Sequence, residues 1–151
     1  MAVTRPSRKQ ARRDAAFVLY QHDVTGSPLA ALLDALRGDE GYAADEFTLR
    51  CTAGVLADRE KIDALIEAHS ENWTLDRLAP LERNILRLAV FELRAGETPP
   101  EVAIDEAVRL AKRYSSNEAG GLVNGILAGV WRALQEGAAE DERDERGRED
   151  P

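Results

Sequence analysis

The 151-residue sequence predicts an all-α fold of about seven helices. Apolar residues recur three and four positions apart over most of the chain, which is the spacing that places side chains on one face of a helix. No segment shows the alternation of apolar and polar residues that is typical of a half-buried strand. Several prolines and glycines stand where these segments are expected to begin or end. The length is sufficient for one domain with a substantial core.

The first half of the chain predicts four helices. We expect the first over about residues 7–24, and a stripe along it combines basic charge with an aromatic ring: Lys9, Arg13, Ala16 and Tyr20. Ser27 and Pro28 predict the start of a short helix that Gly38 ends. A third helix is expected over about 44–57, and a fourth from Asp58 to about Asn72.

The second half of the chain predicts three more helices. The most apolar segment runs from Pro80 to Gly96 and is typical of a central helix. A helix over about 101–115 follows, with an outward Asp105/Arg109 pair four residues apart. The last helix, over about 117–134, carries a row of glycines: Gly121, Gly125 and Gly129. Such a row indicates close approach of another backbone, by a neighbouring helix or by RNA, and of the two we favour helix packing.

Charge is spread unevenly along a chain whose net charge is −8. Residues 1–13 form a basic N-terminal segment with five positive charges and no negative one. Residues 136–151 hold eight acids against three arginines, with no apolar residue beyond Ala139. Such a composition is typical of disorder. We therefore expect a folded unit over residues 1–135 and an acidic disordered tail over 136–151.

The sequence lacks the motifs of common catalytic sites. Cys51 is the single cysteine and lies on an expected inward face, so we interpret it as a core residue. Histidine and cysteine ligands at metal spacing are absent, and so is a glycine loop for phosphate, which predicts a protein without metal or cofactor and not an enzyme. No secretory signal or membrane-spanning run is present, so we expect a cytoplasmic protein.

Four motifs stand in an order that resembles the NusB family of transcription antitermination factors. They are "AR..A..VLYQ", "LERNILRLAVFEL", "VAIDEAVRLAKRYS" and "LVNGIL", and the resemblance covers about residues 8–134. It implies an all-helical fold of two packed helical subdomains. It also implies binding of single-stranded boxA RNA in ribosomal RNA leaders, together with NusE, a small-subunit ribosomal protein, within the antitermination complex of RNA polymerase.

The resemblance also implies which residues bind. The basic segment matches the family's arginine-rich RNA-binding segment, and Arg and Lys suit single-stranded RNA because they neutralise phosphates. The expected RNA contacts are Arg8, Lys9, Arg12, Arg13, Leu122 and Asn124. The expected NusE contacts are Tyr20, Glu82 and Glu118. Relatives commonly have Lys-Phe where this chain has Gly121-Leu122, so a stacking ring is missing. We further expect the acidic tail to compete with RNA for the basic segment.

Other interpretations remain open from the sequence. The chain also resembles the NusB-like RNA-binding domain of ribosomal RNA methyltransferases, of which it would be a fragment. A helical adaptor without RNA affinity is a further alternative. A helix-turn-helix DNA-binding protein is disfavoured, because the most basic helix balances its cations with acids. The sequence does not decide whether the protein forms a homodimer.

Overall fold

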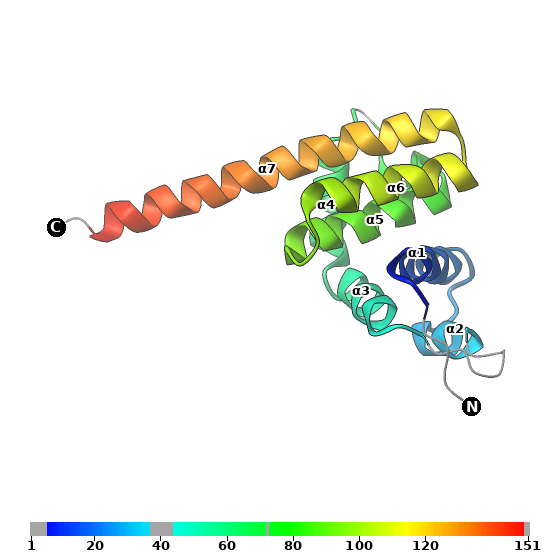
Figure 1. The fold of residues 1–151 in the computed structure, drawn as a ribbon. Helices are drawn as coiled ribbons and strands as arrows, with labels where there is room; N and C mark the ends of the chain where they lie inside the picture. The colour runs from blue at the N-terminus through cyan, green and yellow to red at the C-terminus, as the bar shows by residue number, and fades with distance from the viewer. Residues whose placement is uncertain (1–5, 37–43, 72, 150–151) are drawn as a thin grey trace.

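The computed structural model describes residues 6–36, 44–71 and 73–149, which contain seven α-helices, one short 3₁₀ helix and no strand. Figure 1 shows the chain from the N-terminal α1 to the long α7. The elements are α1 (Arg8–Thr25), α2 (Leu29–Ala35), α3 (Glu46–Ala57), α4 (Arg59–Ala68), η1 (Leu75–Arg77), α5 (Pro80–Ala95), α6 (Pro100–Tyr114) and α7 (Asn117–Glu149).

Helix α5 lies at the centre, as the sequence predicts. Its side chains from 84 to 90 are all buried, and it packs against α1, α3, α4, α6 and α7. Helices α1, α2 and α3 form one group and α4 to α7 form the other, with α5 carrying most of the contacts between them (Figure 1). The all-α fold and its two packed subdomains are therefore confirmed.

Local capping explains where several helices begin or end. Ser7 accepts a hydrogen bond from the backbone N–H of Gln10 at 3.1 Å, and Asp45 accepts one from Phe47 at 2.8 Å. Gly26 and Gly96 end α1 and α5 with φ values of 73° and 72°, the left-handed conformation that glycine adopts without strain. The predicted boundaries of α1, α3, α5 and α6 lie within about two residues of the observed ones. The expected stop at Gly38 lies outside the described residues.

The acidic C-terminal segment differs from its prediction. Helix α7 continues through Glu149, and every described side chain from 135 to 147 is exposed. Alanine, glutamate and arginine are good helix formers, and extending an existing helix avoids the cost of nucleating a new one. The far end of α7 points away from α1 (Figure 1), so the expected competition of this segment for Arg8 to Arg13 does not follow from its placement.

A buried ion pair joins α1 to α5. Arg12 is only 5% exposed, and its guanidinium binds the Glu92 carboxylate through both Nε and Nη2 at 2.9–3.1 Å. Thr98 donates a further hydrogen bond to Glu92 at 3.0 Å. The ring of Phe47 lies 5.1 Å from the Arg12 guanidinium. Each of these buried charges therefore has a partner of opposite charge, without which its burial would strongly destabilise the fold.

A second network ties the end of α1 to α4 and α5. Asp23 accepts hydrogen bonds from Arg83 at 2.7 Å, Asn84 at 2.9 Å and Arg87 at 3.1 Å. Arg87 also binds Asp63 at 2.8 Å. Burial raises the pKa of Asp23, but the hydrogen bonds and charges of Arg83, Asn84 and Arg87 outweigh burial and hold that pKa below its ordinary value.

Cys51 is buried in the core at 1% exposure, which confirms its interpretation as a core residue. Burial, with a smaller contribution from the Glu92 charge, raises the pKa of its thiol to about 12. The thiol is therefore protonated at neutral pH. In the described part of the chain, no helix has the length and apolar character needed to cross a membrane.

We expect Arg12→Ala to lower the free energy of unfolding by about 3–5 kcal/mol, because it leaves the Glu92 charge buried without its partner. The double variant Arg12→Met/Glu92→Leu should regain most of that loss, since it removes both charges. Urea unfolding monitored by circular dichroism measures both values. A double variant as unstable as Arg12→Ala would show that packing, and not the unpaired charge, causes the loss.

The Asp23 network predicts a loss of stability in acid. A carboxylate whose folded pKa is depressed contributes stability above its unfolded pKa of about 3.9 and loses it as the pH falls through the folded pKa. Unfolding of Asp23→Asn across the acid range should therefore show lower stability at pH 7 and a shallower decline below about pH 4. Asp34→Asn, an exposed carboxylate on α2, is the control. If the stability of Asp23→Asn and that of the natural protein declined equally steeply below about pH 4, Asp23 would not be the group that causes the loss.

Candidate nucleic-acid interface

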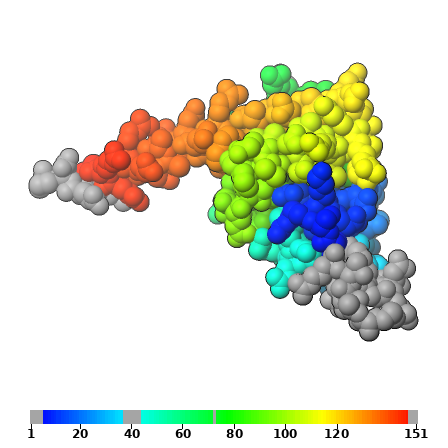
Figure 2. Space-filling model, viewed as in Figure 1, coloured from blue at the N-terminus to red at the C-terminus, as the bar shows by residue number. Residues whose placement is uncertain are grey.

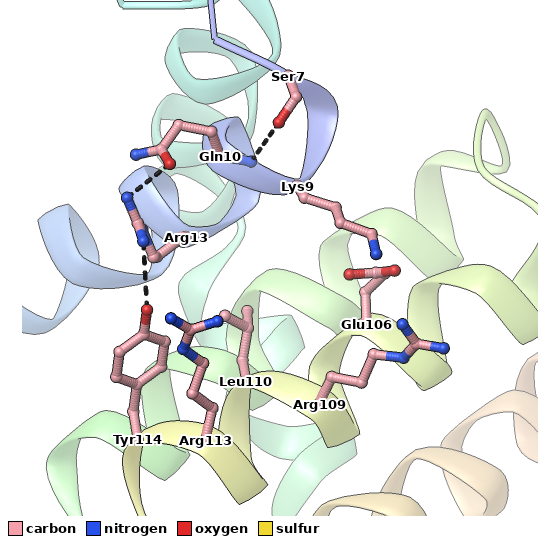
Figure 3. A pocket seen from close by; sticks show the side chains of 9 residues that line it. All are labelled: Ser7, Lys9, Gln10, Arg13, Glu106, Arg109, Leu110, Arg113 and Tyr114. Atoms are coloured by element: carbon pink, nitrogen blue, oxygen red, sulfur yellow. Dashed lines mark hydrogen bonds between the residues drawn. The ribbon is translucent and has the colours of Figure 1, made fainter.

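A basic hollow of about 330 Å³ lies between the start of α1 and one face of α6 (Figure 3). We call it the α1–α6 hollow. It opens to solvent, and its walls come from segments about 100 residues apart in the chain. Its lining residues are Ser7, Lys9, Gln10, Arg13, Glu106, Arg109, Leu110, Arg113 and Tyr114.

Contacts of Tyr114 hold two of the hollow's four cations in place. Arg13 donates to the Tyr114 hydroxyl at 3.4 Å and also to the side-chain oxygen of Gln10. The Tyr114 ring meets Phe17 edge to face at a centroid distance of 5.0 Å. The Arg113 guanidinium lies 5.5 Å from the same Tyr114 ring. Tyr114 is therefore a fixed support for two arginines.

Positive charge dominates the hollow. Its lining holds four cations against the single carboxylate of Glu106, toward which Lys9 points (Figure 3). Arg109 also pairs with Asp105 at 3.1 Å, as the sequence predicts, but this pair is exposed and therefore weak. Several cations around one opening attract phosphate, and planar guanidinium groups bind phosphate oxygens through two hydrogen bonds.

The four expected RNA contacts in the basic segment separate into two kinds. Lys9 and Arg13 line the hollow, and Arg8 is exposed on α1 with its guanidinium 4.2 Å from the Phe47 ring centroid. Arg12 is different, because its guanidinium is buried and bound to Glu92. The expectation that Arg12 contacts RNA is corrected on this geometry, since its donors already serve a carboxylate inside the core. Residues 1–5 of the basic segment lie outside the described residues.

Leu122 and Asn124 are exposed on α7 and do not line the α1–α6 hollow. Leu122 instead borders a second hollow of about 230 Å³, which we call the Trp73 hollow. Its lining residues are His69, Ser70, Glu71, Trp73, Gly121, Leu122, Gly125 and Ile126. Two candidate contact surfaces therefore exist, one lined by α1 and α6 and the other by α7 and the segment after α4.

Two of the expected partner contacts lie near the α6–α7 turn. Glu82 accepts a hydrogen bond from the Ser115 hydroxyl at 2.8 Å, and Glu118 is exposed in the first turn of α7, three residues later. Tyr20 is half-buried on α1, two helical turns beyond Arg13. The structure thus places Glu82 and Glu118 at one end of the molecule, and the partner role of all three residues stays a prediction.

The sequence interpretation missed the contribution of α6 to the α1–α6 hollow, above all Arg109, Arg113 and Tyr114. The charges on α6 sum to zero, so its net charge gave no indication of a basic surface. The net charge does not show that Arg109 and Arg113 lie on one face. Positions 106, 109, 110 and 113 are spaced as one helical stripe, and this spacing is the signal that could have identified them.

Comparison with known proteins shows which family this chain resembles. The family model described as "NusB family" matches residues 9–132. The transcription antitermination protein NusB of Rubrobacter xylanophilus is 45% identical over 125 residues, which cover 82% of this chain and 89% of that protein. This chain is therefore similar to curated NusB proteins over most of its length.

Solved structures show the same likeness. T. maritima NusB aligns with a TM-score of 0.77 and 36% identity, covering 85% of this chain and 93% of that one. A crystal structure of the antitermination factors NusB and NusE in complex with double-stranded RNA contains a chain that aligns at a TM-score of 0.74 and 33% identity, covering 83% of this chain and 96% of that one. With the family match over most of the folded region, these likenesses show that the chain belongs to the NusB family.

Proposed function

We propose that this protein is a transcription antitermination factor that binds single-stranded boxA RNA of ribosomal RNA leaders together with NusE. The α1–α6 hollow is the observation that carries the proposal, because it gathers Lys9, Arg13, Arg109 and Arg113 around one opening. The family membership supports the proposal as a whole, and the similar chain that was solved with NusE and double-stranded RNA supports its RNA-binding and NusE-binding parts. The protein acts by binding and not by catalysis.

The chemistry of the hollow suits a single strand. Phosphates of an unpaired strand can enter a concave surface from several directions, whereas duplex DNA is usually read by a helix or ribbon in its major groove. Arg8 extends the basic surface beyond the hollow on the solvent side of α1. Arg8, Lys9, Arg13, Arg109 and Arg113 are the proposed phosphate contacts.

NusE is the proposed protein partner, with Tyr20, Glu82 and Glu118 as its contacts. Acidic side chains at the α6–α7 turn suit a basic ribosomal protein, because complementary charge speeds encounter and disfavours wrong partners. This surface lies beside the α1–α6 hollow, since α6 connects to α7 through two residues only. This arrangement allows the protein to bind one RNA strand and NusE at the same time. The RNA polymerase antitermination complex in the cytoplasm is the proposed setting.

The proposal is tested by the affinity of the full chain for labelled boxA RNA. Scrambled RNA of the same composition and duplex DNA are the controls, each with and without NusE. Tight binding of boxA RNA that NusE strengthens supports the proposal. A helical adaptor would bind NusE alone. Equal affinity for every nucleic acid would contradict boxA recognition.

The α1–α6 hollow predicts the salt dependence of RNA binding. Lys9→Ala/Arg113→Ala should weaken binding and lower the slope of log affinity against log salt by up to about 1.4, because each single-strand phosphate contact contributes about 0.7. Both side chains are exposed, so the melting temperature should stay close to that of the natural protein.

The matched control is Arg143→Ala/Arg146→Ala, which removes two exposed charges from the far end of α7. Its salt slope should equal that of the natural protein. Fluorescence anisotropy at four salt concentrations measures all three proteins. A similar loss of slope in the control would mean that net charge, and not the hollow, governs affinity.

The proposed NusE surface predicts a charge effect on association. Glu118→Lys should slow NusE association at low salt, and the difference should shrink as salt rises because the charges are screened. Glu136→Lys makes the same charge change further along α7 and should leave the association rate nearly unchanged. Stopped-flow mixing with NusE measures both. Equal rates for the two variants would remove Glu118 from the interface.

A further inference from the structure

A close neighbour faces only one of the three glycines in the predicted row on α7. A Cβ on Gly129 would lie 2.7 Å from the ring of His69, which ends α4, so the expected helix packing is confirmed there. A Cβ on Gly121 or Gly125 would have no atom within 4 Å, so the packing prediction is wrong for these two. Helix α7 is thus held closely near Gly129, and its later part projects from the body of the molecule (Figure 2).

A groove of about 320 Å³ lies where α7 leaves the body, between α7 and the end of α5. We call it the α5–α7 groove, and it opens to solvent. Leu93 is only 4% exposed, and Trp131 and Leu134 are half-buried against the core. The lining is mostly apolar and consists of Leu93, Arg94, Trp131, Leu134, Gln135 and Ala138.

Arg94 is the cation of this lining, and its charge already has a partner. Its Nη1 lies 3.6 Å from a carboxylate oxygen of Asp58, and its side chain is 28% exposed. An arginine whose charge is paired contributes chiefly the carbons of its side chain to an apolar surface. The α5–α7 groove therefore carries no unbalanced positive charge.

The face of α7 that lines the groove becomes acidic further along the helix. Trp131, Leu134 and Ala138 are spaced three and four residues apart, as residues on one helix face are. The same spacing leads on to three exposed acids, which we call the acidic stripe: Asp141, Glu142 and Glu145. From Trp131 to Glu145 this face is about 21 Å long, at a rise of about 1.5 Å per residue. One continuous face is thus apolar at one end and negatively charged at the other.

The charge of this part of α7 restricts what can cover the face. The exposed side chains of residues 136–147 include six acids and two arginines. Nucleic acids and anionic membranes are repelled by such a charge. A second copy lying parallel would place acids against acids, and one lying antiparallel would place carboxylates against the apolar groove. Charge complementarity therefore favours a basic partner that also has apolar side chains.

The shape of the face suits a helix. An amphipathic helix commonly binds by placing apolar residues, spaced three and four apart, in a groove between two helices. The face of α7 is straight and long enough for about four turns of a partner helix. Leu93, in the groove, lies about 17 Å along the α5 axis from Glu82, in the proposed NusE surface. A helix bound here leaves the NusE surface and the α1–α6 hollow open.

We propose that the α5–α7 groove and the acidic stripe together form a docking surface for a basic amphipathic helix of another protein. Apolar side chains of that helix enter the groove beside Trp131 and Leu134. Lysine or arginine side chains one to two turns further along it pair with Glu142 and Glu145. The surface is a third contact site, and the inference does not depend on the RNA or NusE proposals.

The test uses two labelled synthetic peptides of about 18 residues, which is long enough for the 21 Å face. Each contains no tryptophan and carries leucines at helical spacing in one half and lysines on the same face in the other half. One peptide begins with the leucine half and the other with the lysine half, because a helix can bind in either direction. Fluorescence anisotropy measures their affinity for the full chain, and one of them should bind. A peptide of the same composition without the helical spacing is the control.

Charge reversal tests the acidic stripe. Glu142→Lys/Glu145→Lys should weaken binding of the peptide by about 10-fold at about 0.1 M salt, because two ion pairs are replaced by two repulsions. Glu136→Lys/Glu140→Lys makes the same change in net charge on the opposite face of α7 and should keep most of the affinity. All four positions are exposed, so the melting temperatures should stay close to that of the natural protein.

The apolar half of the surface has its own test. The chain has two tryptophans, so Trp73→Phe leaves Trp131 as the only one. Binding of the peptide should shift the Trp131 emission to shorter wavelength, because the half-buried indole loses its remaining contact with water. Ala138→Gln places a polar side chain in the groove and should weaken binding, whereas Ala139→Gln, beside the groove lining, should not.

Several outcomes would overturn the inference. Neither peptide may be replaced by its unpatterned control: equal binding of the control would show attraction by charge alone, as would equal losses in the two charge-reversal variants. Failure of both peptides to bind excludes the docking surface. Self-association of the natural protein that Ala138→Gln abolishes would assign the groove to a second copy of the chain. None of these results changes the measured binding of RNA or NusE, so the proposed function is tested separately.

Discussion

The buried contact between Arg12 and Glu92 fixes where the first helix lies on the central one. Its two partners are 80 residues apart in sequence, and sliding α1 by one residue would leave two charges inside the protein without partners. Because α1 is held in this register, Lys9 and Arg13 face α6 and form one wall of the α1–α6 hollow. The positions of these two surface cations therefore depend on an ion pair that is itself buried.

Helix positions could be predicted from the sequence because the residues that begin and end helices act locally. Ser7, Asp45 and Gly96 each fix a helix end through contacts within a few residues. The acidic end of α7 was mispredicted for a related reason. Its composition offers nothing to bury, but a helix that has already formed extends through alanine and glutamate at little cost.

The candidate site was less predictable because it is built from distant segments. Arg12 and Arg13 look alike in sequence, and only the packing of α1 on α5 turns one toward Glu92 and the other toward Tyr114. Exposure of Trp73 could not be foreseen either, since a tryptophan in an apolar stretch is usually interpreted as core. The sequence position of a glycine within a helix does not show whether another side chain or open solvent lies next to its Cα.

The length of α7 has an electrical consequence. Its last 14 residues, 136–149, extend the helix by about 21 Å, twice the Debye length of about 10 Å at 0.1 M salt. The acids there repel a polyanion without weakening its attraction to the distant cations of α1 and α6. The molecule is thus a permanent electric dipole with separated poles. A nearby strand of phosphates exerts a torque on it, so that the basic end turns toward the strand before contact.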